Sequence, residues 1–131
     1  MSDTAGLAIL AYVPHPMKAH MEALEAAAPG DLRQVFTIEE FVRASSGKSY
    51  GVALIPAGGF TSEQWWQIWG SVNGMEPRPS LLVYAMRSDF QMWSSVLEAG
   101  GYDVIVAPFT ETKLRHALQS AADEYTRSRG A

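Results

Sequence analysis

The chain has 131 residues, of which 47% are apolar and 18% are charged, and its formal net charge is -4. This length and balance predict one globular domain with a buried core, and they exclude a largely disordered chain. Ten scattered basic residues argue against a nucleic-acid surface. The absence of cysteine excludes disulfides and thiolate metal sites. Because the chain has no apolar run of about 18 to 20 residues, we expect a cytoplasmic protein without membrane contact.

The first half of the chain predicts two strand–helix units. Residues 7–13 are a continuous apolar run of strand length, and the apolar spacing over 16–28 predicts a helix with Pro in its first turn. Residues 32–35 form a short second strand. Thr37, followed three residues later by Glu40, predicts a capping box at the start of the second helix.

The second half predicts three more units. Further strands are expected at 50–55, 81–85 and 104–109. Three helices are expected, one capped by Thr61 or Ser62 and ending at Asn73-Gly74, one over 88–99, and one capped by Thr110.

Strands that are apolar on both faces and alternate with amphipathic helices indicate a parallel sheet covered on both sides. The fold class predicted is therefore α/β, a doubly wound five-stranded parallel sheet. We expect a single domain over 1–125, with 126–131 as a flexible tail or the start of a linker to a further domain.

The stretch from Leu81 to Leu118 is similar to the last third of a response-regulator receiver (CheY-like) domain. Its final strand ends in Ala107-Pro108-Phe109, where receivers have Lys-Pro-Phe. This resemblance implies the flavodoxin-like strand order 2-1-3-4-5, and it implies that the bond before Pro108 is cis.

The resemblance also implies which positions would carry the phosphoryl chemistry of receivers. It matches Pro56 to the phosphoacceptor aspartate, and it matches the acidic pair that binds Mg²⁺ to the segment containing Tyr12 and Val13. The Thr/Ser, aromatic and Lys positions are matched by Ala85, Val104 and Ala107 respectively. A receiver with these residues is degenerate: we expect no catalytic residue, no metal, no cofactor and no enzyme activity.

Other motifs give no stronger signal. Gly47-Lys48-Ser49 resembles the end of a phosphate-binding loop but lacks the Gly five residues earlier. His15 and His20 are five residues apart, which is not the spacing that puts two metal ligands on one helical face.

The expected helix over 88–99 carries two apolar stripes, and the resemblance places Phe90, Trp93 and Leu97 on its outer side. Exposed aromatic residues anchor protein interfaces, so we expect a homodimer or a protein partner at the face formed by this helix, the fifth strand and the last helix. Coverage of the stripe by loops or the tail is the alternative. We expect Trp65 and Trp69 in the core, on the stripe that they share with Ile68 and Val72. Trp66 lies about 100° from this stripe and is a second, weaker interface candidate.

The sequence thus predicts a non-phosphorylatable pseudo-receiver that acts by protein contact, through dimerisation or control of an output module, in bacterial-type signal transduction or transcription regulation. The alternative is a small flavodoxin-like ligand-binding domain or enzyme. Its crevice would lie at the carboxyl ends of the strands, where Tyr12, Pro56, Gly58 and Ala85 would converge.

Overall fold

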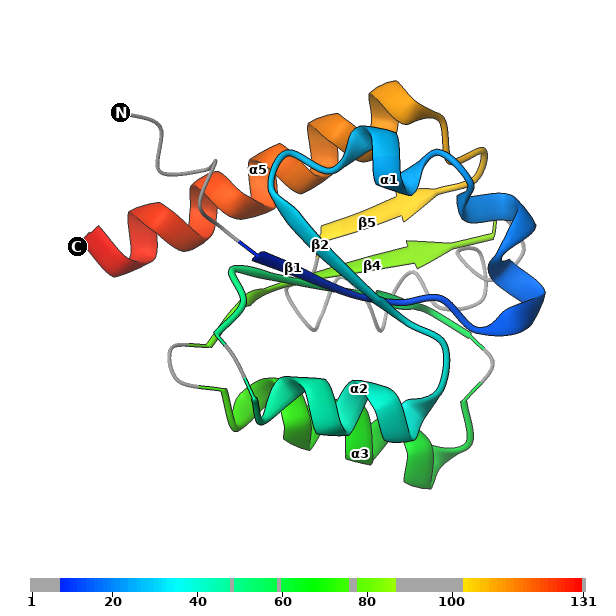
Figure 1. Ribbon diagram of the computed structural model, residues 1–131, viewed down its shortest axis with the longest axis vertical. Coiled ribbons are helices and arrows are strands. Elements are labelled where there is room, and N and C mark those ends of the chain that lie inside the picture. The colour runs from blue at the N-terminus through cyan, green and yellow to red at the C-terminus, as the bar shows by residue number, and fades with distance from the viewer. Residues whose placement is uncertain (1–7, 48, 59, 76–77, 87–102, 131) are drawn as a thin grey trace.

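The computed structural model describes residues 8–47, 49–58, 60–75, 78–86 and 103–130, and its centre is one parallel sheet (Figure 1). The strands are β1 (Ala8–Tyr12), β2 (Asp31–Val35), β3 (Val52–Pro56), β4 (Ser80–Ala85) and β5 (Asp103–Val106). Their order, β2-β1-β3-β4-β5, and their parallel pairing confirm the predicted doubly wound, flavodoxin-like topology.

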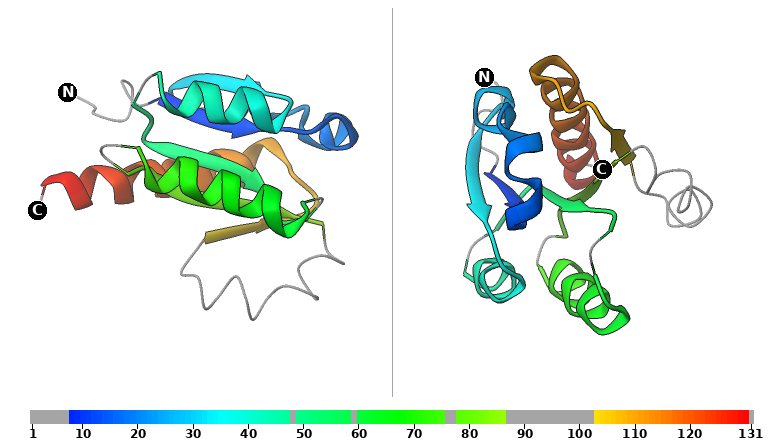
Figure 2. Two further views of the ribbon diagram at one scale, coloured as in Figure 1. Left: turned by 90° about the horizontal axis from the view of Figure 1, so that it is seen from below. Right: turned by 90° about the vertical axis from the view of Figure 1, so that its right-hand side faces the viewer.

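Helices cover both faces of the sheet (Figure 2). One face carries α1 (Leu24–Ala27) and α5 (Glu111–Gly130), and the other carries α2 (Ile38–Ser45) and α3 (Ser62–Asn73). Two 3₁₀ turns, η2 (His15–Met17) and η3 (Ala19–Met21), precede α1. The expected helix over 88–99 lies outside the described residues.

The core consists of two apolar layers, one on each face of the sheet. Ile9 and Ala11 belong to the layer beneath α1 and α5, whereas Leu10 and Tyr12 belong to the layer beneath α2 and α3. Successive strand residues point to opposite faces, and burial on both faces is what makes these strands continuous apolar runs. Within the described part of the chain, no helix is long and apolar enough to span a membrane.

The expected single helix over 16–28 is wrong, because the segment forms η2, η3 and a four-residue α1. Its buried residues are Met21, Leu24 and Ala27. These are three apart, so a segment with about three residues per turn keeps them all on the core side, as a 3₁₀ geometry does.

The chain beyond residue 125 also differs from expectation, because α5 continues to Gly130 and contains most of the expected tail. No Gly or Pro interrupts the sequence between Glu111 and Arg129. Burial of Leu118, Ala122 and Tyr125 at spacings of four and three residues holds α5 against the sheet along much of its length.

Strand and cap predictions need smaller corrections. β5 ends at Val106 rather than at residue 109, since Pro108 has no N–H to continue the ladder. Thr61 does cap α3, in a reciprocal capping box with Gln64 (3.1 and 3.0 Å). Thr37 caps α2, but the Glu40 carboxylate accepts from the Phe36 N–H at 2.8 Å rather than from the cap residue.

Candidate functional site at the carboxyl edge of the sheet

Five of the matched receiver positions meet where the strands end. Tyr12 ends β1 and Val13 follows it, Pro56 ends β3, Ala85 ends β4 and Ala107 follows β5. The first four are buried and Ala107 is half-buried. This carboxyl edge of the sheet is therefore filled by apolar side chains at the positions that the resemblance assigns to phosphoryl chemistry.

The two other matched positions are not buried. Val104 pairs with Val83 in the middle of β5 and is half-buried. Pro108 is exposed, and the bond between Ala107 and Pro108 is cis, as the resemblance implied.

Among the residues that the structure describes, no group of three or more His, Asp or Glu side chains is arranged to hold a metal ion. The crevice proposed for a ligand also has little open surface, because Tyr12, Pro56 and Ala85 are buried and Gly58 is half-buried.

The most distinctive polar group at the edge is one that the sequence analysis missed. The Tyr84 hydroxyl donates to the Tyr12 backbone carbonyl at 2.8 Å, and the Tyr84 ring packs edge-on against Phe109 with 5.5 Å between centroids. Tyr84 is fully buried. Burial raises the pKa of its hydroxyl well above the ordinary value, and the neighbouring Tyr12 raises it further. A tyrosine within an apolar strand is a usable signal, because a buried hydroxyl needs a partner.

An aromatic row runs from this edge along α3. Tyr12 stacks on Phe60 at 5.8 Å between centroids, Phe60 contacts Trp65 at 6.0 Å, and Trp65 stacks on Trp69 at 6.4 Å. The Arg78 guanidinium lies over the Trp69 ring at 5.2 Å. Trp65 and Trp69, expected in the core, are only half-buried, so this row borders the core rather than filling it.

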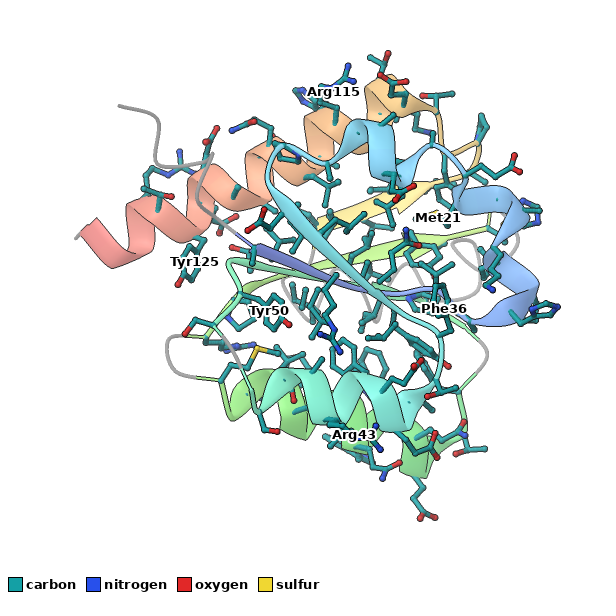
Figure 3. The ribbon with its side chains drawn as sticks, viewed as in Figure 1. Met21, Phe36, Arg43, Tyr50, Arg115 and Tyr125 are labelled. Atoms are coloured by element: carbon teal, nitrogen blue, oxygen red, sulfur yellow. The ribbon has the colours of Figure 1, made fainter. Side chains whose placement is uncertain are left out.

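Two lysines reach the same edge from other elements. The Lys18 ammonium lies 4.4 Å from the centroid of Phe36, and Figure 3 shows Phe36 where β2 ends. The Lys113 ammonium donates to the Val106 carbonyl. A cation therefore lies near the end of β5 although residue 107, the position matched to the receiver Lys, is alanine. This cation belongs to Lys113 of α5.

The interface candidates are placed only in part. Trp66 is exposed, with 65% of its surface accessible, which agrees with its predicted position off the buried stripe of α3. Phe90, Trp93 and Leu97 lie outside the described residues. Their role as an interface stays a prediction.

Comparison with protein-family profiles finds no match, and comparison with curated proteins finds none. Solved structures, in contrast, share the fold over nearly the whole chain. A response regulator receiver protein from Sinorhizobium medicae has 14% identity and a TM-score of 0.68, covering 92% of this chain and 97% of that one. A response regulator receiver domain protein from Clostridium thermocellum has 13% identity and a TM-score of 0.69, covering 93% and 98%.

A third similar structure has a different name. An adenylate cyclase structure from Rhodopirellula baltica has 11% identity and a TM-score of 0.75, covering 95% of this chain and 93% of that one. The chain therefore has the fold of receiver domains, at identities that establish the fold alone.

Proposed function

We propose that this chain is a non-phosphorylatable receiver-like domain that acts in signal transduction by contact with another protein chain. The observation that carries the proposal is the apolar carboxyl edge, where Tyr12, Val13, Pro56 and Ala85 are buried. In a working receiver that edge holds an acceptor carboxylate and a divalent cation, as the resemblance implies.

Phosphoryl transfer to a protein side chain needs a nucleophilic oxygen and a cation that neutralises the transferred oxygens. Pro56 offers no oxygen on its side chain, and Tyr12 and Val13 offer no carboxylate. Burial of all three also removes the water-filled space that a hydrated Mg²⁺ and a phosphoryl donor would occupy.

Regulation by contact does not need these groups. Dimerisation, docking of a partner or restraint of an output module requires a complementary surface, and the receiver fold supplies such surfaces without chemistry at the sheet edge. The proposed roles are therefore a regulatory module or adaptor in signalling or transcription regulation, with no enzyme activity of its own.

The proposal is tested by incubating the folded chain with acetyl phosphate and Mg²⁺ and measuring its intact mass, beside a receiver known to be phosphorylated. We expect the mass of this chain to stay unchanged while the reference receiver gains a phosphoryl group. A stoichiometric gain of a phosphoryl group on an Asp or Glu of this chain would contradict the proposal.

The contact surface needs a separate experiment, because the predicted face includes residues outside those described. Sedimentation equilibrium of the wild type beside Phe90→Glu/Trp93→Glu, after circular dichroism confirms that both fold, tests homodimerisation through the predicted face. We expect a wild-type dimer that becomes monomeric in the double variant, with Trp66→Ser as a control that stays dimeric. If the wild type is monomeric at every concentration, homodimerisation is excluded and the contact is with a different protein.

A further inference from the structure

The Tyr12 carbonyl points away from β2. The Val13 N–H donates to the Val35 carbonyl at 2.9 Å, so this N–H points toward β2. In a planar trans peptide the carbonyl of the preceding residue points the opposite way. The Tyr12 carbonyl therefore points from β1 toward β3, the neighbour on the other side.

The residue of β3 that faces this carbonyl is Pro56. The Ala57 N–H donates to the Tyr84 carbonyl at 2.8 Å, so it points toward β4. Successive residues of a strand direct their N–H and carbonyl groups to opposite sides, so the backbone nitrogen and carbonyl of residue 56 point toward β1. Ala11 pairs with Leu54, and continuing this parallel register puts the nitrogen of residue 56 opposite the Tyr12 carbonyl. Residue 56 is proline, which has no N–H.

A buried carbonyl that loses its ladder donor is unfavourable unless another donor replaces it. Tyr84 lies opposite Pro56 in the register of β3 and β4. Its side chain crosses the end of β3 on the side of α1 and α5, and its hydroxyl reaches the Tyr12 carbonyl, two strands away, at 2.8 Å. The hydroxyl thus occupies the donor position that Pro56 leaves empty.

We infer that Pro56 and Tyr84 form one unit, an internal seal in which the Tyr84 hydroxyl replaces the missing backbone donor while its ring closes the end of β3 against water and small ligands. The ring is held from the other side by Phe109, which follows β5. The seal links β1, β3, β4 and the segment after β5, so it fixes the carboxyl edge in one arrangement. This inference concerns how the edge is closed and does not depend on what the chain binds.

A double-mutant cycle measured by urea unfolding tests the inference. Tyr84→Phe removes the hydroxyl and leaves the Tyr12 carbonyl without a donor, so we expect the folding equilibrium constant to fall by about tenfold or more. Pro56→Ala restores an N–H at position 56. In that background the same Tyr84→Phe change should lower the constant by less than about threefold, because the backbone supplies the donor.

Pro56→Ala also changes the entropy of the unfolded chain, but this effect is the same in both variants that carry the substitution and cancels in the cycle. Pro16→Ala, at an exposed proline in η2, is the matched control and should leave the Tyr84→Phe effect unchanged. An equal Tyr84→Phe effect in the wild-type and Pro56→Ala backgrounds would overturn the inference.

A second measurement needs no change at position 56. In the wild-type protein, we expect proton NMR to show the Tyr84 hydroxyl as a slowly exchanging resonance with a nuclear Overhauser contact to Val13. A Tyr84 hydroxyl that exchanges rapidly with water in the folded protein would refute the seal, whether or not Pro56→Ala folds.

Discussion

Tyr12 and Tyr84 carry the main electrostatic consequence of the closed edge. Burial raises the pKa of each hydroxyl above 10.0, and the second contribution comes from Glu39 for Tyr12 and from Tyr12 for Tyr84. In the unfolded chain both tyrosines ionise near pH 10, whereas folding moves both ionisations to higher pH, and the fully buried Tyr84 stays protonated well above that pH. Above that pH the unfolded state binds fewer protons than the native state, so stability falls as pH rises.

We predict that the free energy of unfolding decreases between about pH 9.5 and 11, by up to about 1.4 kcal/mol per pH unit from Tyr84. Tyr84→Phe should flatten this decrease, because phenylalanine has no proton to retain. Urea denaturation at a series of pH values measures both slopes. Equal slopes for wild type and variant would show that Tyr84 does not resist ionisation in the folded protein.

The helices are held by hydrogen bonds at their ends as well as by burial of their apolar faces. α3 begins with the reciprocal capping box of Thr61 and Gln64, which satisfies two N–H groups that have no partner inside the helix. The short α1 depends on a neighbour instead. The Arg115 guanidinium of α5 donates to the Ala26 carbonyl at 3.2 Å and pairs with Glu111, and Figure 3 shows Arg115 on α5 near α1.

Loss of the α3 cap should be measurable in global stability. Thr61→Ala removes the acceptor for the Gln64 N–H and should lower the free energy of unfolding by about 1 kcal/mol. Ser62→Ala, one residue later and exposed, is the matched control and should change it by less than about 0.5 kcal/mol. Urea unfolding of the three proteins checks this. A cost at residue 62 equal to that at 61 would contradict the assignment of the cap.

Loss of the link between α5 and α1 should instead appear locally. Arg115→Met keeps most of the apolar stem but removes the donor to Ala26, so the N–H groups of Ala27 and Ala28, which bond within α1, should exchange faster with solvent. Arg127→Met is the same change on an exposed part of α5 and should leave those amides unaffected. Hydrogen exchange followed by NMR distinguishes the two, and unchanged protection in Arg115→Met would show that α1 is held by its apolar contacts alone.

The sheet and its two core layers form a scaffold whose carboxyl edge is filled by buried side chains. A ligand that binds only the native state raises the melting temperature, and above its dissociation constant the rise grows with the logarithm of the free ligand concentration. Because the residues matched to the Mg²⁺ ligands are Tyr12 and Val13, the native state has no carboxylate there to gain from the cation.

We therefore predict that MgCl₂ leaves the melting temperature of the wild-type chain where NaCl of equal ionic strength leaves it. Differential scanning calorimetry at several millimolar concentrations of each salt makes the comparison. A rise that appears only with Mg²⁺ and grows with the logarithm of its concentration would reveal a cation site and count against the proposed loss of receiver chemistry.

The sequence was sufficient for what depends on pattern within short segments. Five strands, a cap of α3 at Thr61 or Ser62 and the order of the sheet were predictable, since each follows from local sequence pattern or from the resemblance of Leu81–Leu118 to receivers. The segment over 16–28 was not, because three-residue spacing and four-residue spacing both bury Leu24, and only packing against α5 decides between them.

The candidate site shows the same division. The apolar character of the edge could be predicted from Tyr12, Pro56 and Ala85, which are individual positions in the chain. The hydrogen bond from Tyr84 could not, because its acceptor is a backbone carbonyl 72 residues away and is left open by a proline on a third strand. Such a bond depends on register, which the hydrophobic pattern specifies where a strand alternates between an apolar and a polar face, whereas β1, β3 and β4 are apolar on both faces.

The bond between Tyr84 and Tyr12 also limits how this sequence can evolve. An aspartate introduced at position 56 would enter an edge already closed by the Tyr84 ring, whereas a smaller residue introduced first at 84 would leave the Tyr12 carbonyl without its donor. Each single step toward phosphoryl chemistry thus passes through a less stable or still closed protein. Loss of the Tyr84 hydroxyl is therefore tolerated only when position 56 has regained a backbone N–H, and natural variants of this chain that lack Tyr84 should also lack Pro56.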